Sequence, residues 1–276
     1  EIDTSWNPNS PGQINSIAID GSDIYVAGAF SGTIGGQSRN RLAKLNSTNG
    51  NADVSWNPNS PGSVSKIAIN GSDIYVGGAF TGTIGGQTRN RLAKLNKTNG
   101  TADASWNPNS PSTVSAIAFI GSDIYVGGSF NGTIGGQPRG RLAKLNNTTG
   151  AADATWNPAS PGAVNTIAIS GSDIYVGGAF SGFIGGLSRN RLAKLNSTNG
   201  NADASWNPNS PSTINTIVIS GSDIYVGGAF IGTIGGQTRS CLAKLNNSSG
   251  DADASWNPDA NSTCSVIEIS GSDIYA

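Results

Sequence analysis

The sequence predicts an all-β protein built from repeated antiparallel sheets, and three observations support this prediction. First, a 50-residue unit recurs: residues 1–50 and 51–100 agree at 38 of 50 positions, the unit restarts at 101, 151 and 201, and a sixth copy stops at 276. Second, each unit contains short runs of β-branched and aromatic residues separated by turn residues. Third, no stretch shows helical periodicity. Four short strands in a period of about 50 residues are typical of a β-propeller blade.

The first half of the second repeat predicts a β-hairpin. Residues 64–70 place Ile67 and Ile69 in alternation, as in a strand with one buried face. Gly71-Ser72-Asp73 then predicts a tight turn. Residues 74–80 follow as a second run rich in β-branched and aromatic side chains, so the two runs are expected to pair.

The second half of the repeat predicts a loop and two more strands. Residues 81–88 (TGTIGGQT) are expected to form a glycine-rich loop, and residues 89–96 a third strand. Asn99-Gly100 predicts a turn, because both residue types tolerate positive φ. Residues 102–106 are expected to form a fourth strand, which ends at the following prolines because proline cannot donate to a ladder.

Counting the hairpins predicts six blades in one propeller domain over residues 1–276. The repeats are 1–50, 51–100, 101–150, 151–200, 201–250 and the partial unit 251–276. The sixth blade is expected to be incomplete: residues 264–276 supply its hairpin and residues 2–6 join it from the other terminus, while its third strand is missing. An open edge of this kind predicts a truncated or processed chain or, alternatively, self-association through a strand of a neighbouring molecule.

The repeat resembles two known families. Ile74-Tyr75-Val76-Gly77-Gly78 is similar to the strand ending of the kelch repeat, which forms propellers of similar period. The wider stretch GSDIYVGGAFTGTIGGQTRNRLAKLN, followed by ADASWNP, resembles the delta-sixty repeat of bacterial secreted and surface proteins. This resemblance implies a propeller and an extracellular or cell-surface location. It implies no activity, because that family has no agreed biochemical role.

Composition and charge argue against several classes of function. The formal net charge is −1 and 12% of residues are charged, so no basic stripe is available for nucleic acid. No apolar run approaches the ~18 residues that a membrane span needs. The chain has no His, and its two Cys have no metal-ligand spacing. Repeated, equivalent Asp residues do not provide the unlike carboxylates of a hydrolase. We therefore expect no enzyme activity, no cofactor and no metal.

The charged residues recur at fixed positions, which predicts structural ion pairs. A bidentate guanidinium suits a carboxylate between two sheets, whereas a ring of anion-binding or acid–base groups is the functional alternative. The arginines that open the third strands are Arg39, Arg89, Arg139, Arg189 and Arg239, and the expected partners are Asp3, Asp53, Asp103, Asp153, Asp203 and Asp253.

Aromatic residues are the strongest candidates for ligand binding. A tryptophan ring can stack on a pyranose, so a lectin-like surface for carbohydrate is one interpretation and packing between blades is the other. The tryptophans that precede Asn-Pro are Trp6, Trp56, Trp106, Trp156, Trp206 and Trp256, and the glutamines of the glycine-rich loops are Gln37, Gln87, Gln137 and Gln237.

Two cysteines break the repeat and predict a disulfide. Cys241 replaces the arginine found at positions 41, 91, 141 and 191, and Cys264 replaces the Ile or Val of the five earlier repeats. Both stand at strand starts in adjacent blades. Closing a loop of ~23 residues would stabilise the fold by roughly 3 kcal/mol and would imply an oxidising compartment. Two free buried thiols are the alternative.

These patterns leave two hypotheses for function. One is a secreted or surface-exposed, non-catalytic multivalent binding module, with carbohydrate or a surface protein as its partner. The other is a structural, self-assembling surface or filament protein. A repeated surface suits either of them better than it suits an enzyme, which needs one asymmetric set of unlike groups.

Overall fold

The computed structural model describes residues 6–276, and this part of the chain consists of strands, turns and irregular segments without any helix. It separates into two compact units, which we describe individually. The first comprises Glu1–Ile117, Thr133–Gly136 and Asn146–Ala152, and the second comprises Ala118–Gly132, Gln137–Leu145 and Asp153–Ala276. The single domain expected over residues 1–276 stays a prediction. Within residues 6–276, no helix is available that could cross a membrane.

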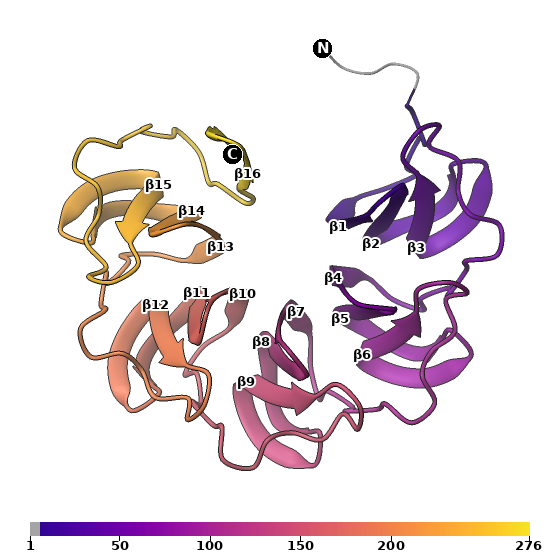
Figure 1. Ribbon diagram of the computed structural model, residues 1–276, viewed down its shortest axis with the longest axis horizontal. Coiled ribbons are helices and arrows are strands. Elements are labelled where there is room, and N and C mark those ends of the chain that lie inside the picture. Colours follow the sequence, from indigo (N-terminus) through magenta and orange to yellow (C-terminus); the bar gives the residue numbers. More distant parts are fainter. Residues whose placement is uncertain (1–5) are drawn as a thin grey trace. The chain divides into compact units, whose positions relative to one another are not determined.

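Each full repeat forms one three-stranded sheet whose strand order follows the sequence (Figure 1). The first unit holds β1 (Ile14–Asp20), β2 (Asp23–Ile34), β3 (Gln37–Asn46), β4 (Val64–Asn70), β5 (Asp73–Ile84) and β6 (Gln87–Asn96). The second holds β10 (Val164–Ser170), β11 (Asp173–Ile184), β12 (Leu187–Asn196), β13 (Ile214–Ser220), β14 (Asp223–Ile234) and β15 (Gln237–Asn246). The third repeat supplies β7 (Val114–Ile120), β8 (Asp123–Ile134) and β9 (Gln137–Asn146).

Two-residue turns connect the strands of each sheet. In the second repeat Asn70 pairs with Asp73 across Gly71-Ser72, which confirms the predicted hairpin. The predicted loop over residues 81–88 is wrong, because β5 continues to Ile84 and Ile84 pairs with Gln87. Gly85 (φ 54°) and Gly86 (φ 83°) form the connection. Two successive positive φ angles match the twist of a tight hairpin, so the glycines make a turn where we expected a loop.

The segment predicted as a fourth strand does not form a strand. In the second repeat, residues 102–106 contribute one isolated bridge, between Ala102 and Leu95. The Asp103 amide donates to the Lys94 carbonyl oxygen at 2.9 Å. The Asp103 carboxylate then accepts hydrogen bonds from the Ser105 amide and hydroxyl at 2.9 and 2.7 Å. These bonds favour a turn over an extended strand, so the sheets are three-stranded rather than four-stranded.

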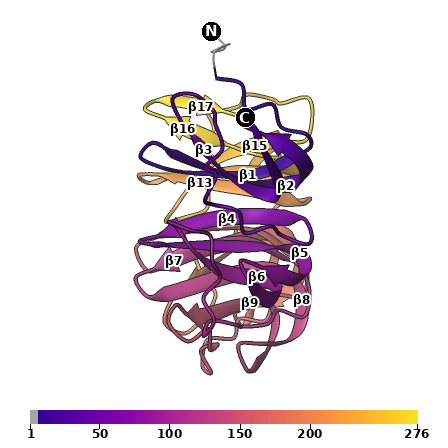
Figure 2. The same cartoon turned by 90° about the vertical axis from the view of Figure 1, so that its right-hand side faces the viewer.

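The partial sixth repeat forms a shorter sheet. Its strands are β16 (Glu268–Ser270) and β17 (Asp273–Tyr275), which pair with each other (Figure 2). Residues 2–5 of the predicted N-terminal strand lie outside the described residues. Trp6 packs against the hydrophobic cluster of the first sheet and donates its indole N–H to the Asn46 carbonyl oxygen at 3.1 Å. The count of six blades stays a prediction.

Successive sheets within each unit pack face to face. In the first unit, Tyr25 and Leu42 of the first sheet share one cluster with Val64, Ile74 and Val76 of the second. In the second unit, Tyr175 and Leu192 form the same contact with Ile214 and Val226. Both faces of a sheet are therefore apolar, and hydrophobic burial between sheets is the main source of stability.

Candidate functional site

One lysine in each full repeat bridges two aspartates. In the first repeat, Lys44 lies between Ala43 and Leu45 of β3 and pairs in register with Tyr25 of β2. Its ammonium lies 3.1 Å from Asp23, which opens β2, and 3.2 Å from Asp53, which follows the isolated bridge. The lysine thereby joins three separate segments of its repeat. We call this arrangement the Asp–Lys–Asp triad.

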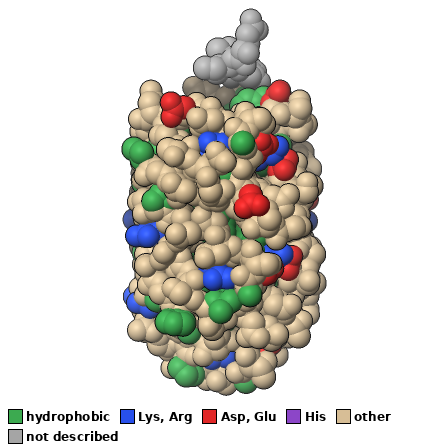
Figure 3. Space-filling model, turned by 90° about the vertical axis from the view of Figure 1, so that its left-hand side faces the viewer, with side chains coloured by type: hydrophobic (Ala, Val, Ile, Leu, Met, Phe, Trp, Pro, Cys, Tyr) green, Lys and Arg blue, Asp and Glu red, His purple; other side chains and the backbone are tan. Residues whose placement is uncertain are grey.

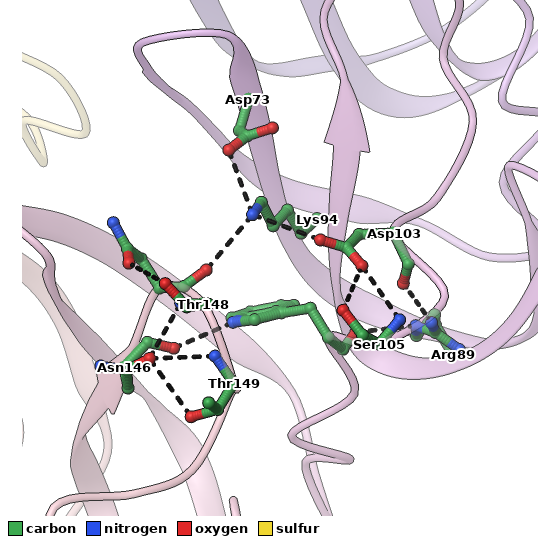
Figure 4. Close-up of polar contacts among 10 residues, drawn as sticks. Asp73, Arg89, Lys94, Asp103, Ser105, Asn146, Thr148 and Thr149 are labelled. Atoms are coloured by element: carbon green, nitrogen blue, oxygen red, sulfur yellow. Dashed lines mark hydrogen bonds and ion pairs between the residues drawn. The ribbon is translucent and has the colours of Figure 1, made fainter.

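The triad recurs in all five full repeats. Its N–O distances are 3.0–3.4 Å throughout, and the lysine side chains are 12–22% exposed. Figure 4 shows the second repeat, in which Lys94 also donates to the Asn147 carbonyl oxygen at 3.3 Å. The triads are Asp23–Lys44–Asp53, Asp73–Lys94–Asp103, Asp123–Lys144–Asp153, Asp173–Lys194–Asp203 and Asp223–Lys244–Asp253.

A polar cavity opens over three of these triads. In the first unit it has a volume of about 360 Å³ and is lined by the triad of Lys44 together with Asn46, Asn49 and Asn51. In the second unit the cavities over Lys194 and Lys244 have volumes of about 220 and 340 Å³. We call these three cavities the triad pockets. Each presents carboxylate, ammonium and amide groups side by side.

An asparagine turn builds the rim of the pocket. The side-chain oxygen of Asn46 accepts hydrogen bonds from the amides of Thr48 and Asn49, at 2.9 and 3.1 Å. The Gly50 amide donates back to the Asn46 carbonyl oxygen at 2.9 Å. Asparagine suits this place because its side chain mimics a backbone turn. The turn directs the residues around Asn49 toward the triad.

The predicted Arg–Asp ion pairs are wrong, because each arginine bonds the backbone carbonyl oxygen of the aspartate and not its carboxylate. Arg39 is 4% exposed and donates to the backbone carbonyl oxygen of Asp53 at 2.5 Å, while the carboxylate of Asp53 pairs with Lys44. Arg89 likewise bonds the carbonyl oxygens of Asp103 and Trp106 (Figure 4). The guanidinium is buried with the backbone, whereas the carboxylate points to the half-exposed pocket. The same backbone bond is made by Arg139, Arg189 and Arg239 to Asp153, Asp203 and Asp253. Asp3 lies outside the described residues.

The tryptophans pack inside the fold, so for four of them the packing interpretation is the correct one and the sugar-stacking interpretation is wrong. Trp56, Trp106, Trp156 and Trp206 are completely buried. The ring of Trp106 meets Tyr75 edge-on with centroids 5.4 Å apart, and its N–H donates to the Asn146 carbonyl oxygen at 3.0 Å. Trp6 and Trp256 are half-buried. Trp256 borders a cavity of about 750 Å³ at the sixth repeat, together with Tyr275 and Ala276.

The glutamines stand apart from this aromatic packing. Each of them is the first residue of a third strand, directly after a glycine turn. The pairs across the turn are Ile34–Gln37, Ile84–Gln87 and Ile234–Gln237, and Gln137 begins β9. All four are partly exposed. The turn fixes their position, and none of them lines a triad pocket.

Cys241 and Cys264 are both buried and both free. The predicted disulfide is therefore absent from this structure. Cys241 lies in β15, and Cys264 precedes β16. Among the described residues, no group of three or more acidic, Cys or His side chains is placed to hold a metal ion.

Hydrogen bonds keep the second aspartate of each triad ionised. Burial of Asp153 works against its charge, but bonds from the Thr155 hydroxyl and amide, the Trp156 amide and Lys144 outweigh it and lower the pKa to about 2. The pKa values of Asp53, Asp103 and Asp203 are lowered by the same balance. The pKa of Asp253 is lowered to about 2, mainly by bonds from Ser255. Burial raises the pKa of Tyr25, beside the first triad, to about 12.

Comparison with known proteins places this repeat in a family. The model of a β-propeller domain of unknown function (DUF5122) matches residues 22–55, 73–105, 123–155, 173–205 and 217–255. The chain belongs to this β-propeller family. Each matched segment contains the second and third strands of its sheet and the three residues of its triad, and the fifth also contains most of β13.

Solved structures support the propeller fold. The computationally designed Ika8 protein is similar with a TM-score of 0.62 and 13% identity, over 95% of this chain and 66% of that one. The WD40 domain of Neurospora crassa Pan2 is similar with a TM-score of 0.56 and 12% identity, over 88% and 65%. The chain thus spans slightly less than two thirds of either protein. A search of curated protein sequences gave no match. Identities this low show the fold alone.

The triad lysines are the residues that our sequence analysis missed. In every full repeat this lysine stands between a buried alanine and a buried leucine; the five are Lys44, Lys94, Lys144, Lys194 and Lys244. A lysine that recurs in the buried third strand of every full repeat indicates a partner of opposite charge, because burying an unpaired ammonium is unfavourable in free energy. That signal was present in the sequence of this propeller.

Acid should destabilise the propeller because the carboxylates of the triads have lowered pKa values. A carboxyl whose pKa is lower in the folded state stabilises the fold above its unfolded pKa of about 3.9, and this contribution is lost as the pH falls toward the folded pKa. For Asp153, the window runs from about 4 down to about 2. We expect urea midpoints to fall steadily across this range, and Asp153→Asn to flatten the fall. A midpoint that stays constant from pH 5 to pH 2 would contradict the role of the triads.

Proposed function

We propose that this chain is a non-catalytic, multivalent binding module and that its triad pockets bind carbohydrate. The recurrence of one polar pocket, with the same three charged groups, is the observation that carries the proposal. A propeller suits a binding or scaffold role, and repetition multiplies whatever one repeat can bind. Secretion, the bacterial setting and an extracellular location, which the delta-sixty resemblance implies, belong to this proposal.

The chemistry of the pocket fits hydroxyl groups. A sugar hydroxyl both donates and accepts hydrogen bonds, so it can use a carboxylate oxygen together with an ammonium or amide N–H. The pocket over Lys44 places Asp23 and Asp53 beside Asn49 and Asn51. Volumes of 220–360 Å³ lie near the lower end for ligand sites, which begins at about 300 Å³, and suit a single sugar residue.

Each pocket should bind weakly and the whole chain more strongly. The pockets are open, and the neighbouring Trp56 and Tyr25 rings are buried, so a sugar gains no aromatic stacking there. Linked sites can raise the apparent affinity by about 10²–10⁴ over a single site when the ligand spans them. We therefore expect polysaccharides to bind and the corresponding monosaccharides to bind hardly at all.

A triple substitution of pocket lysines tests this proposal. A glycan array first identifies a binding polysaccharide, and titration calorimetry then compares the wild type with Lys44→Gln/Lys194→Gln/Lys244→Gln. We expect affinity to fall by at least about tenfold, because three of the linked sites lose a charged donor. Circular dichroism confirms that the variant is folded.

Lys97→Gln is the matched control for that experiment. Lys97 pairs with Asp20 at 2.6 Å and lines none of the three pockets, so its variant should bind like the wild type. No binding to any polysaccharide would overturn the proposal, as would an equal loss of affinity in the control and in the folded triple variant.

A structural, self-associating scaffold is the second candidate, and the first sheet gives a reason to keep it. Ile17 and Ile19 of β1 are 57% and 68% exposed. The equivalent Ile67 of β4 is buried in the cluster that contains Tyr25, and Ile69 packs against that cluster. Two isoleucines exposed on one strand form an apolar patch on which a further sheet, from this chain or from another molecule, can pack. Light scattering over a range of concentrations distinguishes the two: oligomers indifferent to sugar favour the scaffold.

A further inference from the structure

The two cysteines replace residues with defined places in the other repeats. Cys241 has a φ of 61°, like Arg41, Arg91, Arg141 and Arg191 at the same position, so the backbone is unchanged while the guanidinium is lost. Arg141 shows what is lost: its Nη1 donates to the Ser160 carbonyl oxygen at 3.1 Å. Cys241 is 4% exposed. A small buried thiol thus stands where a long charged side chain reaches outward.

The second cysteine is directed toward the same place. In the fourth repeat, a β-carbon added to Gly177 would lie 2.6 Å from the Cγ2 atom of Ile214, the residue that Cys264 replaces in the sixth repeat. In the fifth repeat, a β-carbon added to Gly227 would lie 2.5 Å from the sulfur of Cys264, so this thiol rests on Gly227. Gly227 pairs in register with Leu242, the neighbour of Cys241. The Cys264 thiol therefore lies against the rung of the β14–β15 pair whose β15 residue, Leu242, directly follows Cys241, within the second unit.

The backbone at Cys264 lies beside β14, as the backbone at Ile214 lies beside β11 in the repeat before it. The equivalent strand β13 begins at Ile214, which pairs with Gly228. In the sixth repeat, β16 begins only at Glu268. Cys264 keeps a bond from its amide to the Gly228 carbonyl oxygen at 3.1 Å, while Val266 is 58% exposed. The Cys264 carbonyl oxygen accepts from the Asn215 side-chain amide at 3.2 Å, so the backbone of Cys264 is held in place beside β13 and β14. Its thiol donates to the Val266 carbonyl oxygen at 3.2 Å, a weak bond that disulfide formation would break.

We infer that Cys241 and Cys264 are an oxidation site that closes into a disulfide and attaches the start of the sixth hairpin to β15. With a small-molecule disulfide as oxidant, one thiolate attacks a sulfur of the oxidant and releases the first thiol. The second cysteine, after losing its proton, attacks the mixed disulfide and releases the second thiol. Two electrons pass to the oxidant, which is reduced to two thiols. This inference is independent of the carbohydrate proposal.

Burial sets the rate of the reaction. It raises the pKa of the Cys264 thiol, a hydrogen bond with Val266 works against this shift, and Cys241 adds to it. Because the thiolate is the nucleophile, closure should be slow at neutral pH and faster as the pH rises toward 9. The cross-link should slow local opening around Cys264, because any opening would then have to displace β15 as well.

Peptide mapping of the full chain tests the inference. The reduced protein is incubated with oxidised glutathione and digested with trypsin without reduction, which separates Cys241 in residues 240–244 from Cys264 in residues 245–276. We expect a linked pair whose mass is the sum of both peptides less two hydrogen atoms. Hydrogen exchange at residues 264–267 should slow by about tenfold in the oxidised protein.

Two single variants are the controls. Cys264→Val restores the residue of the second, third and fourth repeats, and Cys241→Ser keeps the size of the side chain. Neither should give the linked peptide or the change in hydrogen exchange. The inference is overturned if both cysteines of the oxidised wild type remain alkylatable after denaturation. It is equally overturned if non-reducing gels show only disulfides between chains.

Discussion

Replacing Gly78 with alanine should destabilise the fold by about 3 kcal/mol or more, because the added methyl group would overlap backbone atoms. A β-carbon there would lie 2.3 Å from the Ser63 carbonyl oxygen and 2.8 Å from Cα of Val64. Both are backbone atoms, one in the first residue of β4 and one in the residue just before it, so no rotation of a side chain relieves the contact. Urea denaturation followed by tryptophan fluorescence measures the loss as a lowered midpoint.

Two other glycines make this prediction specific. Gly77→Ala would press mainly on the Val114 side chain, and the first repeat already has Ala27 at that position. Gly140→Ala would meet nothing closer than 3.6 Å. Both should change stability by about 1 kcal/mol or less. If Gly78→Ala unfolded at the same urea concentration as these two, the close approach of the strands would not govern the packing.

The sequence allowed the hairpins to be predicted because local rules decide them. Alternating Ile67 and Ile69, followed by Gly71-Ser72, specify two strands and a turn regardless of the rest of the chain. The error at residues 81–88 was also local: Gly85 and Gly86 have the φ angles of a tight turn, which composition alone did not distinguish from a loop. Only the pairing of Ile84 with Gln87 shows the difference.

The site was harder to predict because its contacts depend on which atom of a residue faces which partner. The periodic positions of Arg89 and Asp103 correctly placed them close together, since the guanidinium bonds the Asp103 carbonyl oxygen. The sequence could not show that the carboxylate of Asp103 turns instead to Lys94. In the structure, the Asp103 amide is bonded to the Lys94 carbonyl oxygen next to the bridge at Ala102, which places the carboxylate within reach of the lysine.

Replacing Trp106 with alanine should cost about 3–5 kcal/mol, as is usual for a large buried aromatic side chain. The ring is completely buried, and the substitution would also leave the Asn146 carbonyl oxygen without its indole donor. The loss of the edge-on contact with Tyr75 adds to the effect. A large fall in the urea midpoint is the expected measurement. Trp106→Phe should recover part of it, because a phenyl ring refills most of the space.

The same variants distinguish packing from ligand contact. Trp6 is half-buried, so Trp6→Ala should lower the midpoint much less than Trp106→Ala. If Trp106→Phe remained folded and lost affinity for a polysaccharide while the triple lysine variant kept it, the tryptophan would be the ligand contact. Since the four central rings are completely buried and three of the lysines border open cavities, we expect the reverse: stability follows the tryptophans and affinity follows the lysines.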